Sequence, residues 1–241
     1  RYIINAIQPA EVNKVIVDES DHRMELVVPD EKLSLAIGRK GQNVRLAAQL
    51  TGWKLDIISD SKFRQMEDEA LVVLKEIDGV DENLAKSIFR LGFRALEEIS
   101  EAAVEELAQI EGVETEERAA ELKRAADSTT ERLRRERIQR ASSQIEPLTE
   151  REKLRFVPGV GLRTLQLLEE AGYRTVPDLA REDADRLAIR TGLGIKKARQ
   201  IQQGAEYFLT SEAREIEATR AQLAAARAAE AAAPGQASEE A

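Results

Sequence analysis

The sequence predicts an α+β domain with a three-stranded sheet and packed helices, followed by two all-α domains. Three observations lead to this prediction. Strand-like alternation of apolar side chains is confined to residues 1–62, the later segments show short helical patterns separated by glycines, and two of those segments repeat each other at a spacing of 80 residues. The length of 241 residues is enough for two or three small domains.

The first domain is expected to run in the order helix, strand, strand, helix, helix, strand. Val15 and Val17 form a short strand pattern, and residues 24–28 alternate in the same way, so that the polar segment between them reads as a hairpin turn. Pro29-Asp30 then opens a helix that lasts to about residue 37, a second helix covers about 42–50, and a final strand covers 53–58.

The helical region carries an internal repeat in which glycines and apolar positions persist while charges change. Leu74–Val80 aligns with Leu154–Val160, and Gly92-Phe93-Arg94 aligns with Gly172-Tyr173-Arg174. The expected domains are therefore residues 1–62, an acidic first repeat at 63–128, a polar linker at 129–148, a second repeat at 149–209, and an Ala/Glu-rich tail at 210–241 that is partly helical or disordered. The Arg-rich 129–148 segment is interpreted as solvated, and the tail has too few large apolar residues to pack.

A glycine-bracketed loop, Gly38-Arg39-Lys40-Gly41, joins the two helices of the first domain. Glycines allow a tight turn and a close approach of a ribose-phosphate backbone, and the following helix presents its positive N-terminal end. Arg39 and Lys40 attract phosphate without reading sequence. This arrangement is the KH motif, whose loop clamps about four nucleotides of a single strand. The alternative is an ordinary turn with exposed charges.

The segment from Val28 to Ala47 resembles the second KH domain of the NusA family of bacterial transcription factors nearly residue for residue, and Leu50-Thr51-Gly52-Trp53-Lys54 continues the match. The resemblance implies a type II KH fold and contact with single-stranded nascent RNA, with Ile37 at the floor of the base-binding groove. The expected RNA-binding residues are Ile37, Gly38, Arg39, Lys40, Gly41, Gln42, Asn43 and Arg45.

Two aromatic residues of this domain admit more than one interpretation. A lone Trp at the start of a strand, here Trp53, is more often a core residue than a stacking platform for bases. His22 is the only histidine, and we interpret it as a solvated turn residue.

The second repeat contains a helix-hairpin-helix pattern in Gly192-Leu193-Gly194, followed by Ala198 and Ile201. Gly159-Val160-Gly161 forms its partner hairpin, although Leu165 replaces the expected Ala. The hairpin amides and following helix N-termini are able to face a phosphate or a carboxylate. The candidate protein-binding residues, with DNA as the alternative ligand, are Gly159, Gly161, Arg163, Gly192, Gly194, Lys196, Lys197 and Arg199.

The first repeat places acids at the corresponding hairpins, Asp81 and Glu114, and residues 64–127 carry a net charge of −10. A carboxylate at that position repels phosphate, so this repeat should not bind DNA. The two repeats also resemble the acidic C-terminal repeats of some NusA proteins, as far as about Phe208. That resemblance implies the C-terminal domain of the RNA polymerase α subunit and antitermination factors as partners; the near-neutral second repeat departs from the acidic family pattern.

Composition excludes several classes of protein. The chain has no cysteine, which rules out disulfides and thiolate metal sites, and it shows no nucleotide-binding loop or nucleophile elbow. We therefore expect no enzyme activity, no catalytic residue, no metal and no cofactor. No apolar run approaches ~20 residues, so no membrane span is expected. The chain is expected to be a cytoplasmic monomer, and its start without Met suggests a fragment whose upstream domains are missing.

The leading functional hypothesis is an RNA-binding transcription elongation factor that takes part in termination and antitermination. The alternative is a DNA repair or recombination accessory protein that binds duplex DNA through its helix-hairpin-helix modules. The KH segment favours the first hypothesis, because its resemblance is long and specific.

Overall fold

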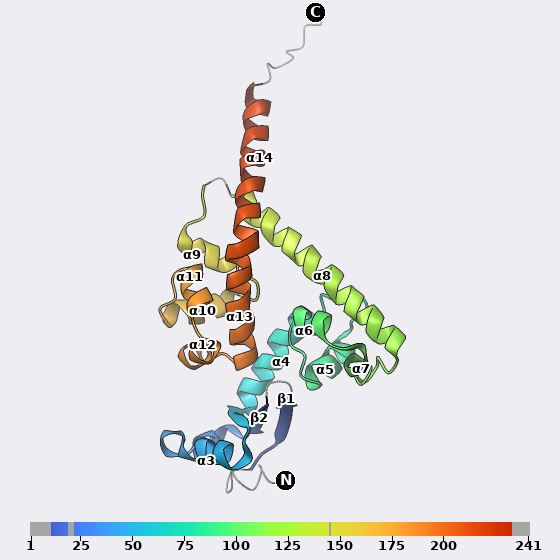
Figure 1. The fold of residues 1–241 in the computed structure, drawn as a ribbon, viewed down its shortest axis with the longest axis vertical. Coiled ribbons are helices and arrows are strands. Elements are labelled where there is room, and N and C mark those ends of the chain that lie inside the picture. Colours follow the sequence, from blue (N-terminus) through green and yellow to red (C-terminus); the bar gives the residue numbers. More distant parts are fainter. Residues whose placement is uncertain (1–10, 19–21, 145, 233–241) are drawn as a thin grey trace, which may run out of the picture. The chain divides into compact units, whose positions relative to one another are not determined.

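The computed structural model describes residues 11–18, 22–144 and 146–232, and the chain divides into two compact units, residues 1–130 and 131–241 (Figure 1). The first unit begins with a three-stranded sheet in the order β1-β2-β3, formed by β1 (Lys14–Asp18), β2 (Arg23–Val28) and β3 (Lys54–Ser59). Strand β1 pairs antiparallel with β2, and β2 pairs parallel with β3. The predicted strands are confirmed, while the helix predicted before them lies outside the described residues.

A parallel pair of strands needs a crossover connection, and the two helices around the glycine loop supply it. The crossover comprises a 3₁₀ turn (Asp30–Lys32), α2 (Leu33–Ile37), a second 3₁₀ turn (Arg39–Gly41) and α3 (Gln42–Thr51). Ala36 and Ala47 are fully buried, and their small side chains let both helices approach the sheet closely. Together with Leu26, Val28 and Leu55 they form the core of this domain.

The helical region contains the predicted repeat. Helix α4 (Asp60–Leu74) follows the sheet directly and leads into the first copy, which consists of α5 (Glu82–Arg90), α6 (Leu96–Glu101), α7 (Val104–Leu107) and α8 (Glu116–Ser142). The second copy consists of α9 (Glu150–Lys153), a 3₁₀ turn (Leu154–Phe156), α10 (Leu162–Glu170), α11 (Val176–Arg181), α12 (Ala184–Thr191) and α13 (Ile195–Tyr207). Helices α5 and α10, like α6 and α11, begin and end 80 residues apart.

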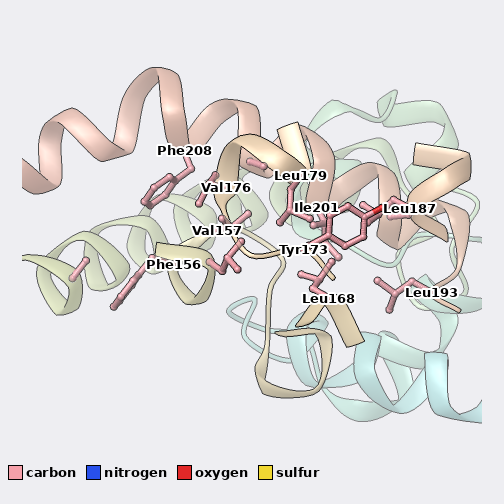
Figure 2. Close-up of a cluster of buried hydrophobic side chains, with 14 of the residues drawn as sticks. Phe156, Val157, Leu168, Tyr173, Val176, Leu179, Leu187, Leu193, Ile201 and Phe208 are labelled. Atoms are coloured by element: carbon pink, nitrogen blue, oxygen red, sulfur yellow. The ribbon is translucent and has the colours of Figure 1, made fainter. Parts of the chain in front are cut away.

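Both copies bury the same positions. Ile88, Ile99 and Leu107 have no exposed surface in the first copy, and Leu168, Leu179 and Leu187 have none in the second. Figure 2 shows the second core, where these leucines meet Ile201 and Tyr173. The apolar positions that the two repeats share are therefore the positions that form their cores.

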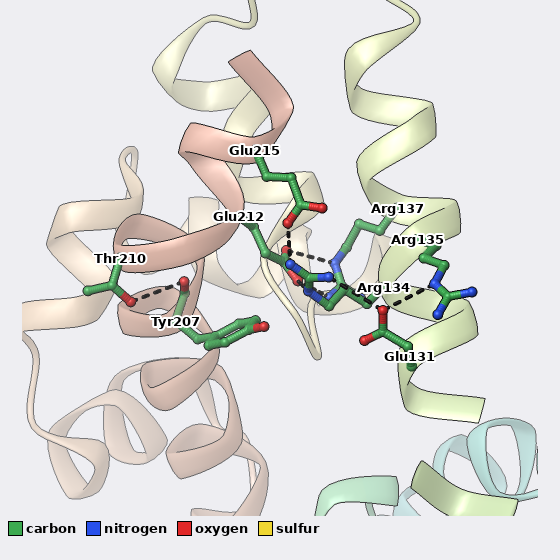
Figure 3. Close-up of polar contacts among 8 residues, drawn as sticks. All are labelled: Glu131, Arg134, Arg135, Arg137, Tyr207, Thr210, Glu212 and Glu215. Carbon is green, nitrogen blue, oxygen red and sulfur yellow. Dashed lines mark hydrogen bonds and ion pairs between the residues drawn. The ribbon is translucent and has the colours of Figure 1, made fainter. Parts of the chain in front are cut away.

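The segment predicted as a polar linker, residues 129–148, is largely helical, because α8 continues to Ser142. Its side chains are also not all solvated. Ile138 and Ala141 join the core of the second unit, and Arg137 Nε donates to Glu212 Oε2 at 3.1 Å (Figure 3). Helical propensity alone does not reveal such contacts, which depend on a partner about 75 residues away.

The tail, which the sequence predicts to be partly helical, forms a π-helical turn (Phe208–Glu212) and then α14 (Ala213–Ala232). Its beginning packs more than its composition suggested. Phe208 and Ile216 are buried in the second core, and Glu212 is fully buried between Arg134 and Arg137. Residues 233–241 lie outside the described part. No helix among the described residues is long and apolar enough to cross a membrane.

Candidate nucleic-acid and protein interfaces

The glycine loop of the KH domain has a backbone that only glycine fits at its first position. Gly38 has φ +73°, and a Cβ built there would lie 2.7 Å from Asn43 Cγ. Gly41 has φ +73° and begins α3 in the left-handed region, and Lys40 is also left-handed at φ +54°. The turn is closed by Gly41 N–H, which donates to Gly38 O at 3.1 Å. The loop therefore has a defined shape rather than that of an open linker.

The sequence-predicted RNA-binding residues all gather at this loop and the adjoining helix ends. Arg39, Lys40, Gln42 and Arg45 are exposed, and Ile37 is half-buried, as a groove-floor residue would be. The positive end of α3 adds to the charge of the two cations.

Asn43 makes a structural hydrogen bond that the sequence did not reveal. Its Nδ2 donates to Leu35 O at 3.0 Å, which ties the start of α3 back to α2 across the loop. The contact of Asn43 with Gly38 explains why the loop holds its shape. We therefore assign Asn43 first to positioning the loop.

In the second repeat, each predicted hairpin ends in a glycine that begins a long helix. Gly161 precedes α10 and Gly194 precedes α13, both in extended conformation and neither with a side-chain cap. Gly159 and Gly192 take the left-handed conformation that the turns require, at φ +83° and +69°. The two hairpins thus present the N-terminal ends of α10 and α13.

The cations predicted to surround these hairpins differ in their surroundings. Arg163 is exposed, whereas Lys196, Lys197 and Arg199 are half-buried. All four interact with other groups of the chain, and Lys197 Nζ lies 3.1 Å from Gln200 Oε1. The positive charge at the hairpins is therefore partly engaged within the chain.

The hairpin region also exposes two large apolar side chains that the sequence analysis did not select. Leu162, the first residue of α10, is 81% exposed, and Ile189, just before the second hairpin, is also 81% exposed. A signal was available in the repeat, since the equivalent residues of the first copy are the polar Glu82 and Gln109.

The first repeat closes the helix ends at its two hairpins with its own side chains. The Asp81 carboxylate accepts from Leu84 N–H at 2.8 Å and caps α5, and Thr115 Oγ1 accepts from Arg118 N–H at 3.2 Å at the start of α8. A carboxylate of the chain therefore occupies the helix end of the first hairpin, and a hydroxyl occupies that of the second.

Comparison with known proteins matches three segments of the chain to two family models. Residues 1–65 match a family described as the NusA-like second KH domain, and residues 71–128 and 151–206 match the SAM-like helix-hairpin-helix tandem. The transcription termination/antitermination protein NusA of Rickettsia conorii is 34% identical over 186 residues, which cover 74% of this chain and 36% of that protein. The chain is a relative of the NusA proteins. NusA of Rickettsia prowazekii is 33% identical over the same length, and the chain spans about a third of both relatives.

The NusA-like KH domain and the first repeat are joined by a buried ion pair. Arg94, at the turn before α6, donates through Nη1 to Glu25 Oε1 on β2 at 3.0 Å and through Nη2 to the other carboxylate oxygen. The two side chains are 11% and 8% exposed. The face of β2 that carries Glu25 is therefore covered by the repeat, whereas the glycine loop belongs to the crossover between β2 and β3.

The carboxylates of this NusA relative do not form a metal centre in the part of the chain that the structure describes. No group of three or more His, Asp or Glu side chains there is arranged to hold a metal ion.

Proposed function

We propose that this chain is the RNA-holding and protein-docking part of a non-enzymatic transcription elongation factor that acts in termination and antitermination. The KH domain holds nascent single-stranded RNA, and the helix-hairpin-helix repeats dock RNA polymerase or antitermination proteins. Both NusA relatives are named as transcription termination/antitermination proteins, which supports the process, and the shape and charge of the glycine loop support the RNA contact.

The observation that carries the RNA assignment is the glycine loop itself. Lys40 and Gly41 form a left-handed turn, and the missing Cβ of Gly41 lets a phosphate backbone approach there. The exposed Arg39 and Lys40 supply charge beside the positive end of α3. Because these contacts address phosphates, we expect binding that is strong at low salt and tolerant of sequence.

The test changes Arg39 and Lys40 together to Asp and measures binding of single-stranded RNA over a series of salt concentrations. We expect weaker binding to every sequence and a flatter salt dependence, because fewer counterions are released. Arg64→Asp with Lys75→Asp is the matched control, since both are exposed cations of the same unit outside the loop. Equal affinity of the loop variant and the control would contradict the assignment.

For the second repeat, the proposed partner is a protein, and the C-terminal domain of the polymerase α subunit is the first candidate. The exposed Leu162 and Ile189 beside the hairpins favour a protein over duplex DNA, since a phosphate backbone offers little to apolar side chains. The open N-termini of α10 and α13 and the exposed Arg163 are suited to carboxylates at the rim of such an interface.

Two double variants of the full chain separate protein from DNA binding. Leu162→Asp with Ile189→Asp should abolish binding of the α domain, while Lys196→Glu with Lys197→Glu should have the larger effect on any duplex binding. Leu223→Asp, which changes an exposed leucine of α14 in the same unit, is the control for added charge. Duplex binding lost in the lysine variant, with no α-domain binding even by the parent chain, would favour the repair-type function.

A further inference from the structure

The rings of His22 and Trp53 form an aromatic stack at one end of the KH sheet. Their centroids lie 4.0 Å apart and their planes differ by 13°. The sheet register explains the pairing: Arg23 faces Lys54, so His22 and Trp53 stand opposite each other one position earlier, and Lys54 N–H donates to His22 O at 3.0 Å.

The two rings differ in burial, and the His22 ring is the one exposed to solvent. Trp53 is half-buried and packs against the KH core between the sheet and the crossover helices, as the sequence analysis favoured. His22 is exposed and lies on the tryptophan rather than in solvent alone. The result is a core-anchored tryptophan that holds a second, solvent-facing ring in a fixed plane.

The stack and the glycine loop stand at opposite ends of helix α3. Gly41 precedes the ten-residue helix, and Gly52 follows it immediately before Trp53. A helix of that length spans about 15 Å. Phosphates of one nucleic-acid strand are spaced by about 3.4 Å or more, so about four nucleotides, the number that a KH loop clamps, fill this distance. The base at the stack then belongs to the next nucleotide of the strand, which a tetramer held at the loop lacks.

We propose that the exposed ring of His22, backed by Trp53, is a stacking site for a base of the single-stranded RNA held at the glycine loop. This inference rests on the proposed RNA binding and adds a second contact to it. Every base has a π face, and histidine is among the side chains on which unstacked RNA bases lie, so the site accepts a base without selecting its identity. The exposed Lys54, next to the stack, adds a positive charge for the strand.

The test uses the full chain with adenine oligoribonucleotides of four and eight residues. His22→Asn removes the ring but keeps a residue that tolerates the left-handed backbone of this position, φ +53°, and His22→Tyr restores a ring. One stacked base corresponds to about a fivefold change in affinity or more. His22→Asn should weaken octamer binding at least about fivefold and leave tetramer binding unchanged, and His22→Tyr should restore octamer binding.

Trp53 supplies a direct signal, because it is the only tryptophan of the chain. We expect the octamer to change its fluorescence and the tetramer to leave it unchanged. If His22→Asn binds the octamer as well as the parent does, or loses both lengths equally, the stacking site is refuted while RNA binding at the loop stands. If the parent binds neither oligomer, the proposed RNA function itself fails.

Discussion

The two helix-hairpin-helix repeats share a fold but end their hairpins differently. At the first hairpin, Asp81 and Gly161 have nearly the same backbone, φ −85° and ψ 179° against φ −94° and ψ 177°. Asp81 closes the N-terminus of α5 with its own carboxylate, while Gly161 leaves α10 without a side-chain cap. One side chain at a conserved backbone position thus decides whether a helix end is closed within the chain or remains available to a ligand.

The turn that follows the first hairpin helix also differs between the two repeats. Arg94 and Arg174 are equivalent, and the backbone N–H of each donates to an acid four residues later, Glu98 or Asp178. The Arg94 side chain is buried against Glu25 of the KH sheet, whereas Arg174 is exposed. The same residue is structural in one copy and solvated in the other because only the first copy has a KH sheet packed against it within its unit.

The largest expected effect comes from breaking the buried pair with Arg94→Ala. Removing one partner leaves the Glu25 carboxylate buried without its cation, which typically costs about 3–5 kcal/mol. Urea denaturation followed by circular dichroism measures the loss, and hydrogen exchange assigns it to the first unit. Arg174→Ala is the matched control and should change the free energy of unfolding by less than about 0.5 kcal/mol. Similar losses in both variants would refute the contrast between the two turns.

A smaller loss is expected from Gly204→Ala in the second unit. A Cβ at Gly204 of α13 would lie 2.6 Å from the backbone oxygen of Pro158, so the hairpin has to move away from the helix. Overpacking of this kind costs about 1–3 kcal/mol. Gly161→Ala is the control, because a Cβ there meets nothing within 4 Å and φ is already negative. Calorimetry of both variants decides the point: a fully stable Gly204→Ala chain would show that the close approach is unnecessary.

Removing the cap of α5 in the first repeat and adding a cap to α10 in the second should change the free energy of unfolding in opposite directions. Asp81→Ala removes the cap of α5 and should cost about 1 kcal/mol, while Gly161→Asp should stabilise α10 by a few tenths of a kcal/mol. The carboxylate of Gly161→Asp should also weaken any carboxylate or phosphate partner of this hairpin, because it takes the place of the ligand. Thermal unfolding and partner binding of the two variants give the readouts. Partner binding unaffected by Gly161→Asp would mean that the open helix end is not used.

The smallest effect is the acid dependence of stability that two carboxyl groups of the second repeat contribute. The hydrogen bond with the Thr175 side chain lowers the pKa of Asp178 from its ordinary 3.8, and the Tyr173 hydroxyl lowers the pKa of Glu182 from 4.5. A carboxyl with a lowered folded-state pKa contributes stability above its ordinary pKa and loses it as pH falls through the folded value. We therefore expect the second unit to lose stability below about pH 4.5.

The counterparts of Tyr173 and Glu182 in the first repeat are Phe93 and Ala102, which lack this contact. Asp178→Asn with Glu182→Gln should therefore flatten the acid dependence of the second unit. Urea denaturation at pH 3 to 7, with hydrogen exchange to separate the units, measures it. An unchanged slope in the double variant would assign the acid sensitivity to other carboxyls.

Much of the fold was predictable because its signals are local. Alternation at Met24, Leu26 and Val28 marks a strand, and glycines at turns mark positions that need a left-handed backbone. The alternation did not reveal that the opposite face of this strand, with Glu25 and Val27, is buried as well. The repeat was visible because positions such as Ile99 and Leu179 are under the same packing constraint. The candidate loop residues were found for the same reason, since a glycine-bracketed turn between two helices is a contiguous motif.

What escaped prediction involves specific side-chain contacts, most of them with partners that are distant in the sequence. Asn43 was assigned to RNA, yet its Nδ2 holds Leu35 O across the loop. The segment interpreted as a solvated linker supplies Ile138 to a core and Arg137 to the buried Glu212 of the tail. His22 was interpreted as a solvated turn residue, and only the register of β2 and β3 brings its ring onto Trp53.

Local sequence patterns were enough to predict the order of the described elements, the two repeats, the glycine loop and the acids that distinguish the first repeat from the second. These features depend on side-chain periodicity and on backbone preferences that act within a few residues. The tertiary structure alone decided which charged side chains are buried, as at Glu25 with Arg94 and at Glu212 with Arg137. A charge enters a protein interior only when its partner is held in place there, and the packing of elements far apart in the chain supplies that partner.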